Sequence, residues 1–399
     1  MVKDILVIIF IILQWILVVY LAFGTLYIFI FSVASLIPCH PKSPKANPTN
    51  RIAVMIPGYK EDEVIVQVAK DALNQNYPKE LYDVVIIADS FKQETITALK
   101  SLPVKVIEVQ FDQSTKSKAL NKAMAQLPDD HYNIIIVLDA DNMMAPDFLN
   151  RINDSYNAGF MAIQGHRIAK NTNTNFAVLD AVSEEINNSI FRKGHRCWGL
   201  SSSLIGSGMA FDYPFFKNLM STVKAVGGFD KEIELKMLKQ GVKIEYLDAA
   251  YVYDEKVQKE EVFVKQRRRW LSAQIHYASY FGDALSNFFG HGNIDYLDKA
   301  KQMLLPPRIL LIGLLPIVTL LSIFINPLFF TIIWGSLLAL LILTFLFAIP
   351  RKFYNGKTLE ALFSIPRGIF LMFTSLFTTK GANKKFIHTE HTSAEKKSN

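Results

Sequence analysis

The chain has 399 residues, half of them apolar, a formal net charge of +7 and two cysteines. This length allows one large globular domain plus membrane segments, and two cysteines form at most one bridge, which excludes a disulfide framework. Basic residues that flank membrane segments explain the positive charge, so we expect no nucleic-acid partner. The cysteines, Cys39 and Cys197, are compatible with a reducing compartment.

The N-terminal segment 1–37 is predicted to be a transmembrane anchor. From Ile5 to about Leu36 the residues are nearly all apolar and none is charged. About 20 helical residues span the hydrocarbon core of a bilayer, so this run is more than long enough. A cleaved signal peptide would have a shorter apolar region and a small-residue cleavage site. We therefore expect one uncleaved helix; two short passes meeting near Gly24 are the alternative.

The linker 38–50 is basic and contains four prolines. By the positive-inside rule its lysines place it in the cytoplasm. The domain that follows, 51–300, should then be cytoplasmic as well. We expect an integral protein of a bacterial inner (plasma) membrane.

The segment 301–350 is predicted to be a transmembrane hairpin. Its apolar run is broken by Asn326 and Pro327, which indicates two spans joined by a tight turn. Arg308 before the run and Arg351 after it place both ends in the cytoplasm, in agreement with the linker.

The segment 351–380 is the last one with membrane character. It is apolar from Leu359 to Phe377 but is interrupted near Arg367. A helix lying in the membrane interface fits this pattern better than a third C-terminal span, which is the alternative. The tail 381–399 is polar.

The middle region alternates short apolar runs with helix-like stretches. The runs are 52–56, 84–88, 104–109 and 134–138. Fully apolar strands between helices indicate a mainly parallel sheet with helices on both faces. Ligands of such sheets bind beyond the carboxyl ends of the strands. Polar residues at those ends therefore share one rim: Tyr59, Asp89, Asp139 and Asp141.

The pair Asp139 and Asp141 follows the fourth apolar run. Two carboxylates two residues apart at a strand end suit a hard cation such as Mg²⁺ or Mn²⁺, with substrate phosphates completing its coordination. Such a cation offsets charge on a diphosphate leaving group. A solvated turn is the alternative.

The segment Gln266–Trp270 is a basic cluster that ends in tryptophan. Arginine forks match phosphate oxygens, and tryptophan can form a wall against a sugar face. A basic-aromatic anchor at a membrane interface is the alternative.

Two glycine-containing segments lie between these motifs. The glycines of Ile205–Ala210 would allow close approach of the backbone to a sugar or an acceptor, or they mark a plain turn. In Gly227–Leu235 an acidic helix follows the glycines. Glu232 or Glu234 could take a proton from an acceptor hydroxyl, and an ordinary charged helix face is the alternative.

The order and spacing of these motifs over residues 50–275 resemble the membrane branch of the family-2 inverting glycosyltransferases, which have a GT-A fold. This branch contains cellulose, chitin and hyaluronan synthases and ceramide glucosyltransferase. The matching segments are Pro57–Glu61 ("P-x-Y-x-E"), Asp89, Lys116–Asn121 ("K-x-x-x-L-N"), Asp139–Asp141 and Gln266–Trp270 ("Q-x-x-R-W").

The resemblance implies three groups of site residues. Donor-binding roles fall on Tyr59, Glu61, Asp89, Lys116 and Asp139. Metal-binding roles fall on Asp139 and Asp141. Catalytic roles fall on Gln266, Arg269 and Trp270, with Arg269 at the departing phosphate and Trp270 shaping the acceptor site.

One motif departs from the family pattern. The family carries Glu-Asp before the helix, the aspartate being the base, and this chain has Lys231-Glu232. Glu232 is therefore the expected base, with Glu234 as the second choice.

The predicted activity is metal-dependent transfer of a sugar from a nucleotide-sugar, UDP-linked, with inversion, to a growing polysaccharide or a lipid. Three spans provide few walls for a pore, so a processive enzyme would need a homo-oligomer or a second membrane subunit. A catalytically inactive sugar-nucleotide-binding scaffold and a nucleotidyltransferase are the alternatives.

Overall fold

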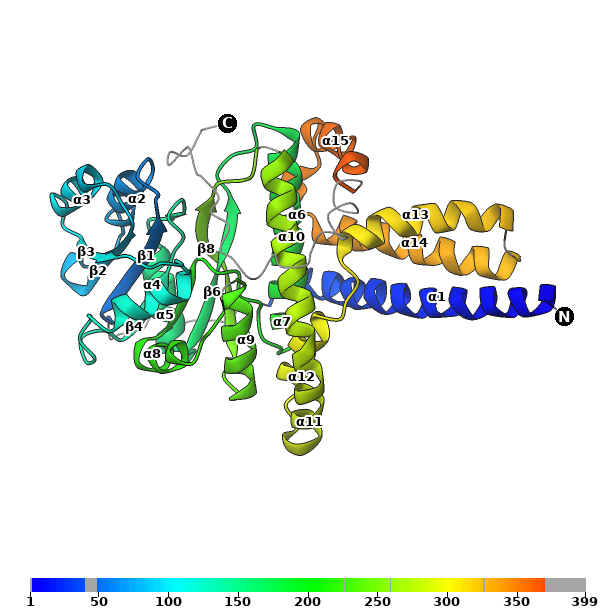
Figure 1. Cartoon of the computed structure of the whole chain (residues 1–399), viewed down its shortest axis with the longest axis horizontal. Coiled ribbons are helices and arrows are strands. Elements are labelled where there is room, and N and C mark those ends of the chain that lie inside the picture. Colours follow the sequence, from blue (N-terminus) through cyan, green and yellow to red (C-terminus); the bar gives the residue numbers. More distant parts are fainter. Residues whose placement is uncertain (1, 40–48, 226, 259, 326, 370–399) are drawn as a thin grey trace.

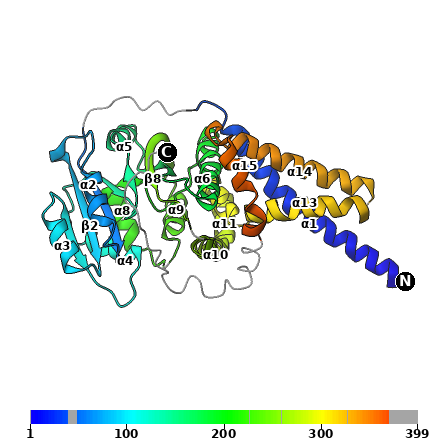
Figure 2. The ribbon, with the colours of Figure 1, turned by 90° about the horizontal axis from the view of Figure 1, so that it is seen from above.

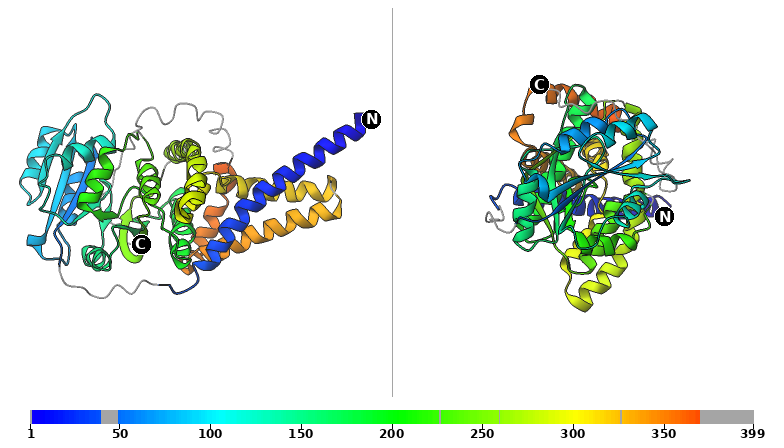
Figure 3. Two further views of the ribbon diagram at one scale, coloured as in Figure 1. Left: turned by 90° about the horizontal axis from the view of Figure 1, so that it is seen from below. Right: turned by 90° about the vertical axis from the view of Figure 1, so that its left-hand side faces the viewer.

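The computed structural model describes residues 2–39, 49–225, 227–258, 260–325 and 327–369. An α/β domain lies at one end, and three long helices project from the other (Figure 1). A layer of helices lies between the two parts, which the views from above and below show from other sides (Figures 2 and 3).

The domain is built on an eight-stranded sheet with the order β3-β2-β1-β4-β7-β6-β8-β5. One half contains strands that pair in parallel: β1 (Ile52–Tyr59), β2 (Tyr82–Asp89), β3 (Lys105–Val109) and β4 (Ile134–Val137). The other half contains β5 (Met143–Met144), β6 (Ala162–Ala169), β7 (Met209–Asp212) and β8 (Ile244–Asp254). β7 runs antiparallel to β4 and to β6, so this half is mixed.

Alternation along the strands creates two apolar cores, one on each face. Along β1, Ala53 and Met55 belong to one core and Ile52, Val54 and Ile56 to the other, as the two-residue period of a strand requires. Three helices cover the first face: α4 (Lys116–Met124), α8 (Tyr213–Ser221) and α9 (Phe229–Lys239). Helices α2 (Ile65–Ala72) and α5 (Phe148–Asn157) cover the second, and Leu99 of the helix Gln93–Lys100 also belongs to its core. The predicted α/β fold with helices on both faces is confirmed.

The four strands of the mixed half were not predicted from the sequence. β6 and β8 contain polar and charged residues such as Arg167 and Glu245, so they lack the continuous apolar run that marks a buried strand. These polar groups are buried in ion pairs and hydrogen bonds, which only the packed structure supplies.

The intermediate layer consists of helices other than those that cover the two faces of the sheet. They are α6 (Asn175–Asn187), the π-helical turn η2 (Asn188–Gly194), α7 (His195–Cys197), α10 (Glu260–Tyr277), α11 (Phe281–His291) and α12 (Ile294–Gln302). In Figure 1, α10 and α11 run across the direction of the long helices. The remaining short helices are α3 (Gln93–Lys100), η1 (Lys79–Leu81), η3 (Ala278–Tyr280), η4 (Arg351–Phe353) and α15 (Gly356–Leu362).

Among the described residues, three helices are long and apolar enough to cross a membrane: α1 (Val2–Ala34), α13 (Arg308–Ile325) and α14 (Leu328–Ala348). α1 is one continuous helix through Gly24, where an added Cβ would collide with the ring of Pro306. α15 lies in the segment predicted to be an interface helix, and residues 370–380 of that segment lie outside the described residues. The division of the chain into six segments stays a prediction.

The end of α1 is fixed against the intermediate layer. The Tyr27 hydroxyl lies 2.8 Å from Nε2 of His195, and the Phe31 ring stacks on the His195 ring with centroids 3.7 Å apart. Cys39 and Cys197 form a disulfide, with Cα atoms 5.5 Å apart. The α1 anchor is therefore tied to α7 by packing, a hydrogen bond and a covalent bridge.

Candidate functional site

The carboxyl ends of β1 and β2 form the first part of the rim. Tyr59 and Asp89 are register partners, and the residues after them, Lys60 and Ser90, have positive φ angles of 56° and 59°. The backbone N–H of Lys60 donates to the Asp89 carbonyl at 3.1 Å, which holds the two turns together. Glu61 and Asp89 are both buried. The structure thus brings Tyr59, Glu61 and Asp89 to one place.

The acidic pair after β4 is held by the loop before β7. The backbone N–H of Asp139 donates to Ser207 Oγ at 2.9 Å, and the Ser207 hydroxyl donates to Asn142 Oδ1 at 2.5 Å. Asn142 Nδ2 in turn donates to Asp141 Oδ1 at 3.2 Å. Asp141 is only 4% exposed. The turn that carries both carboxylates is therefore held by the Ser207 side chain of the glycine-containing loop.

Lys116 joins α4 to this acidic pair. It lies in the first turn of α4, whose N-cap Thr115 accepts from the Lys118 backbone N–H. Its ammonium group pairs with the Asp139 carboxylate and donates to the Gly206 carbonyl at 2.6 Å. Because it bridges a carboxylate and a loop carbonyl, it places one positive charge at the centre of the rim.

The basic cluster of α10 supplies a second charge. Asp139 and Asp230 interact electrostatically with Arg269, whose pKa is lowered by burial despite those two acids. Gln266 Oε1 is buried and has no hydrogen-bond partner among the described residues. Trp270 is 37% exposed, and the Arg267 guanidinium lies 4.4 Å from its ring centroid. α10 therefore presents a buried cation, an unsatisfied acceptor and an exposed aromatic ring.

Of the two acids, Asp230 interacts electrostatically with Arg269, whereas Glu232 is held in an ion pair with Lys236. Burial raises the pKa of Asp230, and Lys116 is among the charges that act on it. Glu232 pairs with Lys236 at 2.6 Å and accepts from the Lys224 backbone N–H at 3.3 Å, on another side of α9.

Glu234 is occupied by structural contacts. It is fully buried, accepts from the Leu204 backbone N–H at 3.0 Å and pairs with Lys231 at 2.9 Å. The sequence prediction passed over Asp230 because family spacing favoured the Lys231-Glu232 pair. The signal that could have found it is its place in the first turn after Gly228, whose φ is 67°.

A buried ionic network lies behind the acidic pair. Asn142 Nδ2 donates to Asp254 Oδ1 at 2.9 Å, and Asp254 pairs with Lys256 at 2.7 Å. Glu184 of α6 pairs with Arg167 at 2.8 Å and with Arg192 at 3.2 Å. Burial alone would raise the pKa of Glu184, but the surrounding cations hold it well below its usual range. The network connects the metal-motif turn to α6.

The rim suits a divalent cation that substrate phosphates help to coordinate. In the described part of the chain no group of three or more His, Cys, Asp or Glu side chains could hold a metal ion. Two carboxylates are nevertheless the protein contribution that Mg²⁺ commonly takes when phosphates and water fill the other positions. Lys116 and Arg269 nearby match the charge of those phosphates.

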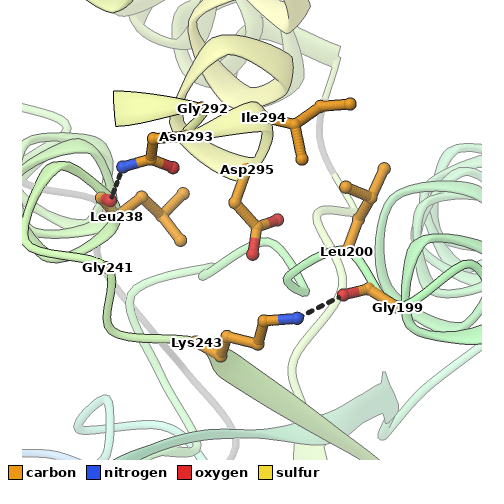
Figure 4. Close-up of a pocket in the computed structure, with 9 residues that line it drawn as sticks. All are labelled: Gly199, Leu200, Leu238, Gly241, Lys243, Gly292, Asn293, Ile294 and Asp295. Atoms are coloured by element: carbon orange, nitrogen blue, oxygen red, sulfur yellow. Dashed lines mark hydrogen bonds between the residues drawn. The ribbon is translucent and has the colours of Figure 1, made fainter. Parts of the chain in front are cut away.

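A separate cavity of about 200 Å³ lies between α7, α9 and the α11–α12 turn (Figure 4). Lys243 Nζ donates to the Gly199 carbonyl at 2.9 Å, and Asn293 Nδ2 donates to the Leu238 carbonyl at 2.8 Å. None of the sequence-predicted site residues lines it. Its polar groups are used in holding the helices of the layer together.

Residues 48–273 match the family model for "Glycosyltransferase like family 2". The chain is also similar to the probable glycosyltransferase YdaM of Bacillus subtilis (strain 168), with 24% identity over 234 residues. That match covers 55% of this chain and 54% of the relative, so the chain spans about half the length of the curated relative it matches.

Two solved structures resemble the chain. The mannosyltransferase PcManGT from Pyrobaculum calidifontis, in complex with GDP-Man and Mn²⁺, has a TM-score of 0.50 and 16% identity, over 84% of this chain and 98% of that one. Glucosyl-3-phosphoglycerate synthase from Mycobacterium tuberculosis, in complex with Mn²⁺, UDP and glucosyl-3-phosphoglycerate, has a TM-score of 0.39 and 13% identity, over 56% and 78%. The first likeness supports the predicted fold. Because the family model covers more than half of the chain, the chain belongs to glycosyltransferase family 2.

Proposed function

We propose that the protein transfers a sugar from a nucleotide-sugar, UDP-linked, with inversion, to a lipid or a growing glycan at a membrane. The observation that carries this proposal is the convergence of Asp139, Lys116 and Arg269 at the carboxyl rim of the sheet. Two cations beside the acidic pair match a diphosphate better than they match a neutral ligand. The GDP-Man and Mn²⁺ bound by PcManGT agree with a nucleotide-sugar donor and a divalent metal, although that donor carries guanosine and not uridine.

The donor would lie across the rim. Tyr59, Glu61 and Asp89 would hold the nucleoside at the ends of β1 and β2. Asp139 and Asp141 would hold Mg²⁺ or Mn²⁺, which, when bound, acts as a Lewis acid toward the diphosphate. Lys116 and Arg269 add positive charge where negative charge develops as the nucleoside diphosphate leaves, and such stabilisation is a large catalytic term.

Asp230 is proposed as the base in place of Glu232. In a single displacement the acceptor oxygen bonds to the anomeric carbon as the carbon–phosphate oxygen bond breaks, and the hydroxyl proton passes to the base. A raised pKa suits this task because the ideal pKa of a base lies near the working pH. The pairing of Glu232 with Lys236 leaves it less suited to accept a proton.

The three apolar helices favour an acceptor that is itself at the membrane. A single transfer to a lipid and a processive extension of a glycan both fit the exposed Trp270. A pore for a long chain would need a homo-oligomer or a second membrane subunit, since three helices provide few walls.

The second candidate is an inactive scaffold that binds a sugar nucleotide. The presence of both acids of the pair and of two neighbouring cations favours the enzyme, because a scaffold does not need a charge-stabilised leaving group.

The deciding experiment measures release of nucleoside diphosphate by the detergent-purified full chain from a panel of nucleotide-sugars, with Mn²⁺, Mg²⁺ or chelator, plus membrane lipid extract. Asp141→Asn is the test variant, and Asp147→Asn, which alters an exposed carboxylate, is its control. We expect metal-dependent turnover of one donor that Asp141→Asn abolishes and Asp147→Asn retains. Donor binding without turnover would favour the scaffold, and no binding of any donor would refute both.

A further inference from the structure

We infer that Asp180 of α6 is a positioning residue that sets the orientation of Trp270 through Arg267. This inference rests on the proposed function where it concerns the acceptor, because Trp270 is the proposed acceptor wall. The contacts themselves are independent of that function.

Asp180 and Trp270 are joined by a single guanidinium group. Arg267 Nη2 lies 2.5 Å from Asp180 Oδ1, in a pair whose side chains are 12% and 8% exposed. The same guanidinium lies 4.4 Å from the centroid of the Trp270 ring. Arg267 and Trp270 are three residues apart on α10 and so share one helix face.

The guanidinium is held by the carboxylate and in turn holds the ring. A charge-assisted hydrogen bond in a mostly buried setting is strong and directional. A cation over an indole face is attracted to it, and the attraction grows as the pair is desolvated. Among the described residues, the Arg267 contact is the one aromatic or cation contact of the Trp270 ring. The ring's orientation therefore depends on where Asp180 places the guanidinium.

Helix α6, which carries Asp180, also contacts both ends of the α13–α14 hairpin. Arg308, which begins α13, donates to Ser183 Oγ at 3.1 Å. Lys352, which follows α14, pairs with Glu185 at 2.6 Å. Because Asp180, Ser183 and Glu185 lie on the one helix α6, this helix connects the hairpin to the Arg267–Trp270 pair. An acceptor that enters from the membrane would meet the ring in a fixed place.

Removing the Asp180 carboxylate should free the Trp270 ring to change its orientation, while the ring itself stays in the protein. Asp180→Asn keeps the size of the side chain but loses its charge, so the guanidinium is free to turn toward other acceptors. Asp180→Glu keeps the charge one methylene farther out and should restore most of the contact. Asp147→Asn is a matched control, because Asp147 also binds an arginine, Arg151, at 2.6 Å.

The first measurement is ¹⁹F NMR of the full chain labelled with 5-fluorotryptophan. The chain has four tryptophans and should give four resonances. The Trp270 resonance is assigned with Trp270→Phe. We expect Asp180→Asn to shift or broaden this resonance alone, while Asp180→Glu largely restores it and Asp147→Asn leaves it unchanged. An unchanged Trp270 resonance in Asp180→Asn would overturn the inference. If all four resonances move in Asp180→Asn, the variant Arg267→Met is measured in its place. An unchanged Trp270 resonance in Arg267→Met would also overturn the inference.

The second measurement separates positioning from general damage. With the acceptor found in the transferase assay, Asp180→Asn should raise the acceptor KM about five- to tenfold and leave the donor KM unchanged, as loss of one aromatic contact predicts. Equal effects on both KM values would refute the positioning role. A protein without transferase activity would refute the proposed function, while the NMR result would still decide the role of Asp180.

Discussion

The ammonium group of Lys116 pairs with the carboxylate of Asp139 and also donates to the Gly206 carbonyl at 2.6 Å. Asp139, the first acid of the pair, is therefore held by a residue of helix α4. Lys116 therefore links α4 to the acidic pair and to the glycine-containing loop.

Replacing Lys116 with methionine should weaken donor binding. The substitution keeps the apolar stem and removes the positive charge beside the diphosphate position, so nucleotide affinity should fall roughly tenfold, about 1.4 kcal/mol. Titration calorimetry with nucleoside diphosphates and Mn²⁺ measures this. Lys122→Met, at an exposed position of the same helix, is the control. Equal affinity in Lys116→Met and wild type would contradict a phosphate-binding role.

The two candidate bases should separate cleanly. Asp230→Asn should lower kcat at least a hundredfold, the usual contribution of a general base, whereas Glu232→Gln should change it less than about threefold. Single-turnover assays with saturating donor measure both. The reverse order would restore Glu232 as the base.

The Asp230→Asn variant should lose activity without losing stability. Because burial raises the pKa of Asp230, its contribution to stability is present below the ordinary aspartate pKa and is lost as pH rises through the raised value. At pH 7 the uncharged asparagine should therefore be at least as stable as wild type. Thermal unfolding in detergent at pH 7 and at pH 4 measures this, and the gain from the substitution should disappear at the lower pH. A less stable variant at pH 7 would show that the carboxylate has a stabilising partner.

Glu184→Gln should be strongly destabilising. It leaves Arg167 and Arg192 without the carboxylate that they share, and breaking one side of a buried ionic network costs roughly 3–5 kcal/mol. Since the pKa of Glu184 is lowered, its contribution is present above the ordinary glutamate pKa and is lost as pH falls below that value. Thermal unfolding of Glu184→Gln beside the exposed control Glu94→Gln tests this at pH 7 and at pH 3. Equal melting temperatures of the two variants at pH 7 would refute it.

The Cys39–Cys197 bridge gives a test of sidedness. The protein should show no reactive thiol under denaturing, non-reducing conditions and two after reduction. Persistent disulfides belong to oxidising compartments, whereas the positive-inside rule predicted the cytoplasm for this face. Alkylation followed by peptide mass spectrometry on membranes prepared with rapid thiol blocking distinguishes the two. Two blocked thiols would favour the cytoplasmic orientation and refute the bridge; an intact bridge would favour the opposite orientation.

The rim at the carboxyl ends of the parallel strands could be predicted from the sequence. Apolar runs ending in polar residues identify the carboxyl ends of parallel strands, and in such a sheet those ends share one rim. Tyr59, Asp89 and Asp139 therefore lie together at the ends of three neighbouring strands, as the pattern predicts. The same logic failed for β6 and β8, because buried polar residues such as Gln164 and Glu245 interrupt their apolar pattern and are satisfied by partners far away in the chain.

The surroundings of Asp230 and Trp270, the proposed acceptor-side residues, depended on tertiary structure. Asp230 and Glu232 are two residues apart on α9, so their side chains point about 200° apart around the helix. Sequence spacing cannot say which of them faces the rim, since that depends on how α9 packs on the sheet. Likewise nothing in the sequence links Asp180 to Arg267, 87 residues later. The sequence by itself determined which strands end in chemically useful groups, because strand periodicity and strand ends are local properties. Only the tertiary structure decided which carboxylates act on Arg269 and which residue pairs with the guanidinium beside Trp270, because those interactions join elements whose relative placement is set by the packing of the whole chain.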